Sequence, residues 1–182
     1  AFIMVGMGLK VAIFPLHLWL PNAYTYAPSA ITSFLAATAT KVAIYVMLRF
    51  LFSVFQPGFL AEVPTLDLIL YPFAILAMFA ASYTAILQRD LKRMLAYSSI
   101  GQVGYMLLGI ALLSESGLMA TMIHLFNHGI TKAALFMGVG VYVLNGGGSF
   151  YHNLRGRGKT MPWTSAAMVV AGLSLIGVPG TA

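Results

Sequence analysis

Charged residues are scarce in this sequence of 182 residues: only 8% of them are charged, while 60% are hydrophobic. A soluble domain carries about 25% charged residues, so this chain could not cover a surface that faces water. Acidic residues number only four, against ten lysines and arginines, which gives a formal net charge of +6. The basic residues outside the apolar runs lie in short connecting segments, where a topology signal explains them better than nucleic-acid binding does. The composition therefore predicts a membrane protein.

Cysteine is absent. The segment can therefore form no disulfide, no thiolate nucleophile and no cysteine-based metal site. A charged leader is also missing, and no signal peptide is recognisable. The chain begins within an apolar run and stops soon after Pro179, so we expect an internal piece of a longer polytopic protein.

Apolar runs of about 20 residues recur along the chain, which is the length of a membrane-spanning helix. Membrane β-barrel strands would instead show a weak alternation over about ten residues. We therefore expect an all-α membrane helix bundle, with residues 1–182 forming a single transmembrane unit. The predicted spans are 1–20, 28–50, 65–87, 94–113, 118–144 and 163–182.

The distribution of positive charge predicts the orientation of this bundle. Residues 88–93 and 145–162 are strongly basic connections, whereas the turn at 114–117 between them has no basic residue. Successive connections alternate between the two sides of a membrane, so both basic segments lie on one side. The positive-inside rule makes that side cytoplasmic. We expect a multi-pass protein of the bacterial inner membrane, with the turn at 20–28 also cytoplasmic.

Two lysines lie inside consecutive apolar spans, Lys10 in the first and Lys41 in the second. A lysine near the bilayer centre costs about 2.5–3.5 kcal/mol on insertion scales, so both call for a reason. Thr38 and Tyr45 lie three and four positions from Lys41, which places them on the same helix face. This polar stripe predicts a suitable environment for a buried ammonium group.

The fifth span is the most polar. His124, His128 and Lys132 follow one another at intervals of four residues, so each is displaced by only about 40° around a helix. Asn127 and Thr131 fall on the same side. Such a stripe would be prohibitive against lipid, so we expect it to face protein or water. Because histidine titrates near neutral pH and a buried lysine can do so too, the stripe favours proton conduction over a purely structural role.

The spacing of the two histidines would also suit a metal ion. A zinc site needs a third protein ligand, however, and the acidic residues lie near span ends or in connections. Neighbouring histidines on one helix also cannot supply the opposite axial ligands of haem. We therefore predict no metal and no cofactor.

Prolines interrupt the first and the last span. Pro15 and Pro179 each remove a backbone hydrogen bond and break or kink a helix. The residues Gly-Leu, followed by Pro after five further positions, recur in both spans, beginning at Gly8 and at Gly172. Ser174 takes the place of Lys10 in the second copy. Paired interrupted helices indicate a transporter repeat with a site near the membrane midplane.

Several motifs occur in a recognisable order: Gly8–Lys10, Phe14–Ala23, Ala27–Ser29, Thr40–Tyr45, Asp90–Ser99, His124–Gly129 with Lys132–Phe136, and Gly177–Gly180. Together they resemble the antiporter-like subunit superfamily. That superfamily comprises the large subunits of Mrp-type monovalent cation/proton antiporters and the proton-pumping membrane subunits of respiratory complex I and related hydrogenases. The resemblance extends over nearly the whole chain.

The resemblance implies a fold of about fourteen helices with inverted repeats and proline-broken helices, of which this chain would supply the seventh to the start of the twelfth. It implies that Lys10 is the channel lysine of the seventh helix, and Lys41 the connecting lysine of the eighth. His124, His128 and Lys132 resemble the relay of the eleventh helix, and His17 is a supporting residue. A glutamate on the fifth helix and a lysine or glutamate on the twelfth are expected outside this chain.

Within the superfamily, the wording of residues 12–29 and the Phe126–His128 motif favour the branch formed by the Mrp-type D subunits. The predicted function is proton translocation by one subunit of a hetero-oligomeric Na⁺/H⁺ antiporter, with other membrane subunits and lipid as neighbours. The alternative branch is a proton-pumping subunit of complex I or a related hydrogenase, where the chain would belong to a translocase. In neither branch does it carry a catalytic site of its own. A structural membrane subunit that transports nothing is an alternative of another class, and a haem-holding anchor is a third.

Overall fold

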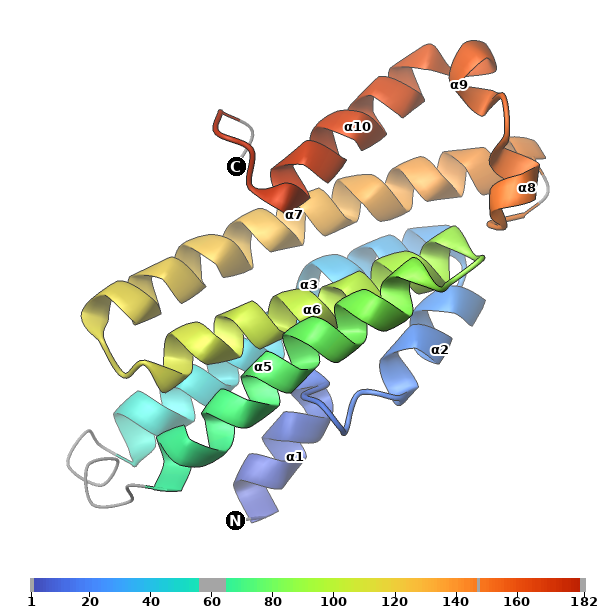
Figure 1. The fold of residues 1–182 in the computed structure, drawn as a ribbon. Coiled ribbons are helices and arrows are strands. Elements are labelled where there is room, and N and C mark those ends of the chain that lie inside the picture. The colour runs from blue at the N-terminus through green and yellow to red at the C-terminus, as the bar shows by residue number, and fades with distance from the viewer. Residues whose placement is uncertain (1, 56–64, 147, 181–182) are drawn as a thin grey trace.

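The structure is a computed structural model that describes residues 2–55, 65–146 and 148–180. For residues 65–67 it describes the backbone alone. Its elements are α1 (Phe2–Val11), α2 (Trp19–Tyr26), α3 (Ser29–Arg49), the π-helical turn η1 (Phe50–Val54), α5 (Thr65–Ile86), α6 (Leu91–Ala111), α7 (Glu115–Gly146), α8 (Tyr151–Leu154), α9 (Arg157–Thr160) and α10 (Pro162–Ile176) (Figure 1).

The predicted all-α membrane fold is confirmed. Within the described ranges, four helical segments are long and apolar enough to cross a membrane: Ser29–Val54, Leu68–Ile86, Leu91–Ala111 and Glu115–Gly146. Helix α6 begins three residues before its predicted start because the Asp90 side chain accepts a hydrogen bond from the Arg93 backbone N–H. Helix α7 extends beyond the predicted 118–144 at both ends, beginning at Glu115 and ending at Gly146.

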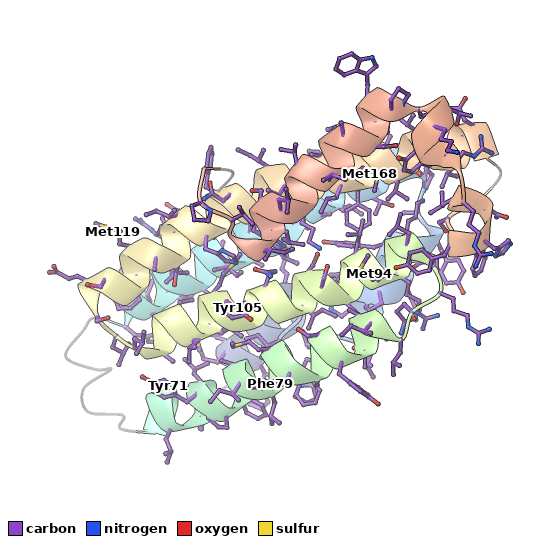
Figure 2. All side chains as sticks on the ribbon, turned by 45° about the horizontal axis from the view of Figure 1, so that its top comes forward. Tyr71, Phe79, Met94, Tyr105, Met119 and Met168 are labelled. Carbon is purple, nitrogen blue, oxygen red and sulfur yellow. The ribbon has the colours of Figure 1, made fainter. Side chains whose placement is uncertain are left out.

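Helix α7 packs against α3, α6 and α10, while α5 runs along the other side of α6 (Figure 1). Small residues bring these helices together, as small residues do in membranes. A Cβ at Gly104 would lie 2.9 Å from the Ala74 carbonyl oxygen of α5, and a Cβ at Gly138 would lie 2.6 Å from Met168 Cγ of α10. The far face of α5 is apolar and exposed, as Phe79 shows at 72% exposure (Figure 2).

The first helix break lies between α1 and α2. Ala12 adopts a left-handed conformation with φ of 64°, and the Ile13 N–H donates to the Gly8 carbonyl at 2.9 Å. This hydrogen bond, with one from the Ala12 N–H to the Leu9 carbonyl, is the Schellman pattern that closes a helix. The Trp19 indole N–H also donates to the Leu9 carbonyl at 2.9 Å, so α2 is tied back to the end of α1.

The break at the end of α10 has the same hydrogen-bond pattern. Gly177 is left-handed with φ of 84°, and the Val178 N–H donates to the Leu173 carbonyl at 3.2 Å. The left-handed residue stands three positions before Pro15 in the first break and two positions before Pro179 in the second. The two caps therefore match with an offset of one residue from the repeat seen in the sequence.

Three connections meet at one end of the bundle (Figure 1). Asp90, before α6, accepts a hydrogen bond from the Ser149 hydroxyl in the connection after α7. Lys92 Nζ donates to the Ala27 carbonyl between α2 and α3 at 3.1 Å. Burial and the neighbouring Asp90 carboxylate raise the pKa of Tyr151 above its usual value. Both basic segments and the connection between α2 and α3 therefore lie at the same end. The predicted turn at 20–28 is instead mostly helical, because α2 occupies Trp19–Tyr26.

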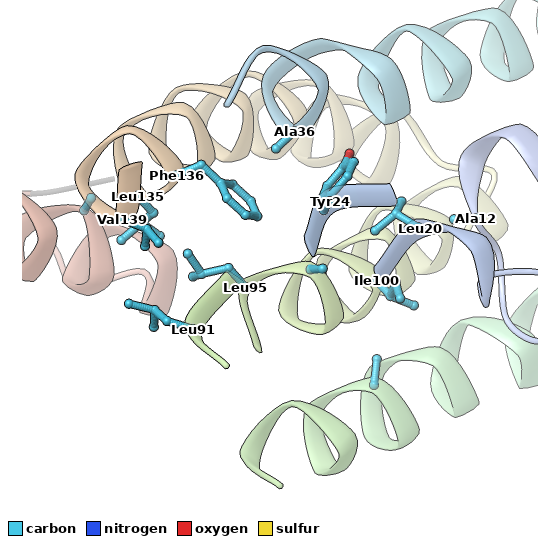
Figure 3. Packing of buried hydrophobic residues seen from close by; sticks show 13 residues of the cluster. Ala12, Leu20, Tyr24, Ala36, Leu91, Leu95, Ile100, Leu135, Phe136 and Val139 are labelled. Carbon is cyan, nitrogen blue, oxygen red and sulfur yellow. The ribbon is translucent and has the colours of Figure 1, made fainter. Parts of the chain in front are cut away.

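A buried hydrophobic cluster holds this half of the bundle around the ring of Phe136 (Figure 3). Tyr24 of α2 meets Phe136 of α7 edge to face, with ring centroids 5.6 Å apart and planes at 89°. Ala36 of α3 and Leu95 of α6 are buried in the same cluster. This packing fixes α2, α3 and α6 around α7 and so sets the position of the polar groups along α7.

Candidate proton-transfer site

The polar stripe of α7 lies on the helix face that packs against the rest of the bundle. His128 and Lys132 are 2% and 0% exposed, and Thr131 is buried beside them. The opposite face is apolar and open, with Phe126 and Ile130 both more than half exposed. The stripe therefore faces protein, where its polar groups escape the cost of contact with lipid.

The two histidine rings of the stripe are stacked. The ring centroids of His124 and His128 are 5.9 Å apart and the planes are 5° from parallel. Tyr105 of α6 approaches the His124 ring edge-on, with centroids 6.4 Å apart. Both ring nitrogens of His128 and Nε2 of His124 are buried without a hydrogen-bond partner among the described residues. Buried nitrogens of this kind normally have partners, so water is the natural candidate.

A cavity of about 710 Å³ lies against the histidines, between α6, α7 and α10. Its polar lining comes from all three helices: His124, Asn127, His128 and Thr131 of α7, Gln102 and Tyr105 of α6, and Ser174 at the end of α10, next to the Gly177 cap. The volume is far above the ~30 Å³ that one water molecule occupies in the liquid. The break in α10 thus opens onto the same cavity as the stripe.

Lys132 is held by α6. Its Nζ donates to the Leu95 carbonyl oxygen at 2.8 Å and to Ser98 Oγ at 2.5 Å. The whole side chain is buried, so both contacts replace hydration of the ammonium group. Thr131 beside it turns its hydroxyl back to the Asn127 carbonyl at 2.9 Å.

Lys41 approaches the stripe from α3. Its side chain is 5% exposed, and Nζ donates to the Ala36 carbonyl one turn earlier in the same helix. Its Cε lies against Gly129, the residue that follows His128 in α7. The structure therefore brings Lys41 against the helix that carries the relay residues.

A glycine makes this approach of α3 and α7 possible. A Cβ at Gly129 would lie 3.2 Å from the Ala37 carbonyl oxygen and 4.0 Å from Lys41 Cε. The distance to the Ala37 oxygen is shorter than an ordinary van der Waals contact. The absence of a side chain at Gly129 therefore allows α3 and α7 to lie this close together beside Lys41.

The supporting residues predicted around Lys41 do not all join it. Tyr45 is 48% exposed and points away from the buried lysine, while the Thr38 hydroxyl donates to the Phe34 carbonyl at 2.8 Å. His17 is buried in the break between α1 and α2, where its ring stacks on Phe14 at 5.2 Å. The polar stripe predicted for α3 is thus reduced to Lys41 on the face toward α7.

Lys10 stands apart from the buried cluster. It lies exposed on the last turn of α1 and lines a small cavity of about 60 Å³ with Met7, Val42, Ala43 and Val46. The structure does not bring Lys10 into contact with the stripe of α7. The lysine is adjacent to α3 one turn beyond Lys41.

Sequence reasoning missed three residues of the site. Ser98 and Tyr105 lie on α6, and Gly129 lies within the histidine motif itself. Their roles depend on contacts between neighbouring helices, and the periodicity of one helix does not predict which helices are neighbours. The adjacent polar residues of α6, Ser98 and Gln102, are four positions apart and were the available signal.

Comparison with known proteins places this chain in a family. A family model described as NADH:quinone oxidoreductase/Mrp antiporter, transmembrane, matches residues 1–182. The N subunit of the NADH-quinone oxidoreductase of Desulforudis audaxviator is 42% identical over 180 residues, which is 99% of this chain and 36% of that protein. The D subunit of the Na⁺/H⁺ antiporter of Alkalihalophilus pseudofirmus is 35% identical over 178 residues, which is 97% of this chain and 35% of that protein.

Among solved structures, the Mrp complex from Dietzia sp. DQ12-45-1b matches with a TM-score of 0.89 and 29% identity, over 97% of this chain and 32% of the other. The chain thus spans about a third of the length of the proteins it matches. These relatives are membrane subunits of multisubunit complexes, which agrees with the confirmed fold. The comparisons do not single out the Mrp branch, since most of the relatives found are N subunits of NADH-quinone oxidoreductases. This chain is a member of the NADH:quinone oxidoreductase/Mrp antiporter transmembrane family.

Proposed function

We propose that this chain forms part of a proton-conducting membrane subunit, in which Lys41, His128 and Lys132 hold and pass protons. The observation that carries the proposal is the burial of these titratable groups together at the junction of α3, α6 and α7. The acidic residues whose side chains are described, Asp90 and Glu115, lie at the beginnings of α6 and α7. Buried cations without a carboxylate are costly to keep for structure alone, whereas burial makes a lysine's protonation state easier to change.

The cavity beside the histidines supports the same function. Its wall offers the unpartnered nitrogens of His124 and His128, with Asn127 between them in sequence. Water beside these polar groups would satisfy the unpartnered nitrogens and carry protons to and from them. The proton path we propose runs through this water, along the histidines, and on to Lys41 and Lys132.

Lys10 extends the proposed path toward the first helix break. An exposed lysine on an apolar membrane helix needs water or another polypeptide as its neighbour. The family resemblance supplies a candidate, a glutamate on a helix outside this chain. We place Lys10 next to Lys41 in this path because Lys10 lines a small cavity with Val42 and Ala43, the residues that follow Lys41 in α3.

The test uses the full-length subunit in its complete complex, reconstituted into liposomes with a pH-sensitive dye. Lys41→Ala and Lys10→Ala should abolish coupled proton transport while the variants still insert and assemble. Lys159→Ala is the matched control, because Lys159 is an exposed lysine in the basic connection. Wild-type rates in Lys41→Ala and Lys10→Ala would show a structural subunit that transports nothing.

Two driving forces are compatible with the family, and we favour coupling to quinone reduction. The observation in its support is the 42% identity to a subunit of NADH-quinone oxidoreductase. An Mrp-type Na⁺/H⁺ antiporter is the second candidate, supported by the relative at 35% identity and the matching Mrp complex. Inside-out vesicles separate them: proton uptake started by an electron donor with quinone supports the first, and uptake started by a Na⁺ gradient supports the second.

A further inference from the structure

The two groups that accept hydrogen bonds from the Lys132 amine differ in their chemistry. Leu95 offers a carbonyl oxygen, which can only accept a hydrogen bond, while Ser98 offers a hydroxyl, which both donates and accepts. A protonated lysine has three N–H donors and no acceptor, but a neutral amine carries a lone pair. Ser98 is therefore the contact that can donate to Lys132 once the lysine has lost its proton.

Competition at the Leu95 carbonyl leaves the Ser98 hydroxyl able to turn. Ser98 Oγ and Ser99 Oγ each lie 3.0 Å from this oxygen, and Lys132 Nζ lies 2.8 Å from it. An α-helix directs a further donor at it, the backbone N–H four residues on. A carbonyl oxygen has two lone pairs, so these four donors cannot all be bound at once.

The position of Ser98 suits a role between the buried lysine and the cavity. Lys132 is fully buried, whereas Ser98 is half-buried on the face of α6 that meets α7. Gln102 lines the cavity one helical turn farther along α6. Ser98 thus contacts Lys132 and lies one turn of α6 from a residue of the cavity wall.

We propose that Ser98 is a positioning residue for Lys132, whose hydroxyl holds the amine both before and after it gives up a proton. The inference rests on the proposed function, since it requires Lys132 to change its protonation state. The Leu95 carbonyl supports only the N–H donors of Lys132. Of the two described contacts of Lys132 Nζ, only the Ser98 hydroxyl can donate to the lone pair of the neutral amine. Loss of that hydroxyl therefore leaves the lone pair without a donor among the described residues.

The neighbouring serine provides a closely matched control. Ser99 is buried and donates to the same carbonyl at the same 3.0 Å, but Lys132 makes no hydrogen bond to it in the described structure. Ser98→Ala and Ser99→Ala each remove one hydroxyl from the same turn of α6. Ser98→Thr keeps the hydroxyl at the critical position and tests whether it is sufficient.

The experiment compares these variants in the complete complex in liposomes, with proton-transport rates divided by the amount of assembled complex. Ser98→Ala should lower the rate about tenfold or more, in line with loss of a hydrogen bond to a charged group, while Ser98→Thr and Ser99→Ala stay within about twofold of wild type. Equal rates for Ser98→Ala and Ser99→Ala, or no rescue by threonine, would overturn the inference. Lys132→Ala tests the underlying function: an inactive Lys132→Ala beside an active Ser98→Ala refutes only the role of Ser98, and an active Lys132→Ala refutes both.

Discussion

At the scale of single residues, the stacked histidines are the groups with the clearest chemical use. His128 is 2% exposed, lies parallel to His124, and keeps both ring nitrogens free of partners among the described residues. An imidazole can accept a proton on one nitrogen and release one from the other, which suits it to a chain of proton transfers. His128 would link the cavity to the two buried lysines.

We therefore expect His128→Ala to lower the proton-transport rate of the complete complex by about 10²-fold or more, the range in which a lost acid–base group acts. His152→Ala is the control, because His152 is exposed at the basic end of the bundle. Dye quenching in liposomes, normalised to assembled protein, measures both. Equal rates in the two variants would remove His128 from the path.

The residues of the site were predictable from the sequence where their arrangement depends on the period of a single helix. The α7 stripe follows from the 3.6-residue period, and the structure places its members on one buried face. Tyr45 was misplaced because burial of Lys41 depends on which side of α3 meets α7, and Tyr45 lies about 40° farther round. Ser98 acquires its role only through the approach of α6 to Lys132, which no spacing in the sequence encodes.

At the scale of helices, the separation of α3 and α7 is set by glycines along one interface. Gly129 faces the Ala37 carbonyl beside Lys41, whereas Gly140 faces Ser29 about three turns away. A Cβ would lie 3.2 Å from its neighbour at Gly129 and 2.8 Å at Gly140. The two sites therefore test packing near and far from Lys41 within the same interface.

Gly129→Ala should push α7 from α3 at the lysine and lower the transport rate per assembled complex by about tenfold. Gly140→Ala has the tighter contact and should reduce thermal stability at least as much, by about 1–3 kcal/mol for overpacking, yet leave that rate unchanged. Thermal unfolding and proton transport are measured on both variants. If the transport rate falls in proportion to the loss of thermal stability in both variants, Gly129 has a packing role only.

At the helix breaks, the sequence predicts that a helix is interrupted but not the residue at which it ends. The prolines predicted that α1 and α10 would be interrupted, and both helices end before Pro15 and Pro179. The residue that terminates each helix is the left-handed one, Ala12 in the first and Gly177 in the second. Capping hydrogen bonds choose that residue, so the two breaks correspond with an offset that the repeated prolines alone do not show.

At the scale of the whole molecule, composition predicted a membrane protein, and apolar runs of about 20 residues predicted helices rather than barrel strands. The motif order was enough for the family, which the match over residues 1–182 confirms. The choice between branches was not recoverable from these residues. The candidate site is built from α3, α6 and α7, and under the proposed function the driving reaction would lie outside this chain.

The orientation in the membrane remains a prediction that the bundle's geometry makes easy to test. The basic segments and the connection between α2 and α3 are gathered at one end, and the turn before α7 lies at the other end (Figure 1). The 182 residues contain no cysteine, so single cysteines can be introduced at Lys159 and Ser116, which are both exposed.

With a membrane-impermeant maleimide, Lys159→Cys should react in inside-out vesicles, where the cytoplasmic face is outside, and Ser116→Cys should react in right-side-out vesicles. The positive-inside rule gives this direction, since the connections around Lys159 and Arg93 hold most of the positive charge. The parent complex without an introduced cysteine supplies the background labelling. The reverse pattern would place the basic end outside the cytoplasm, and labelling of both sites from one face would contradict the arrangement of helices itself.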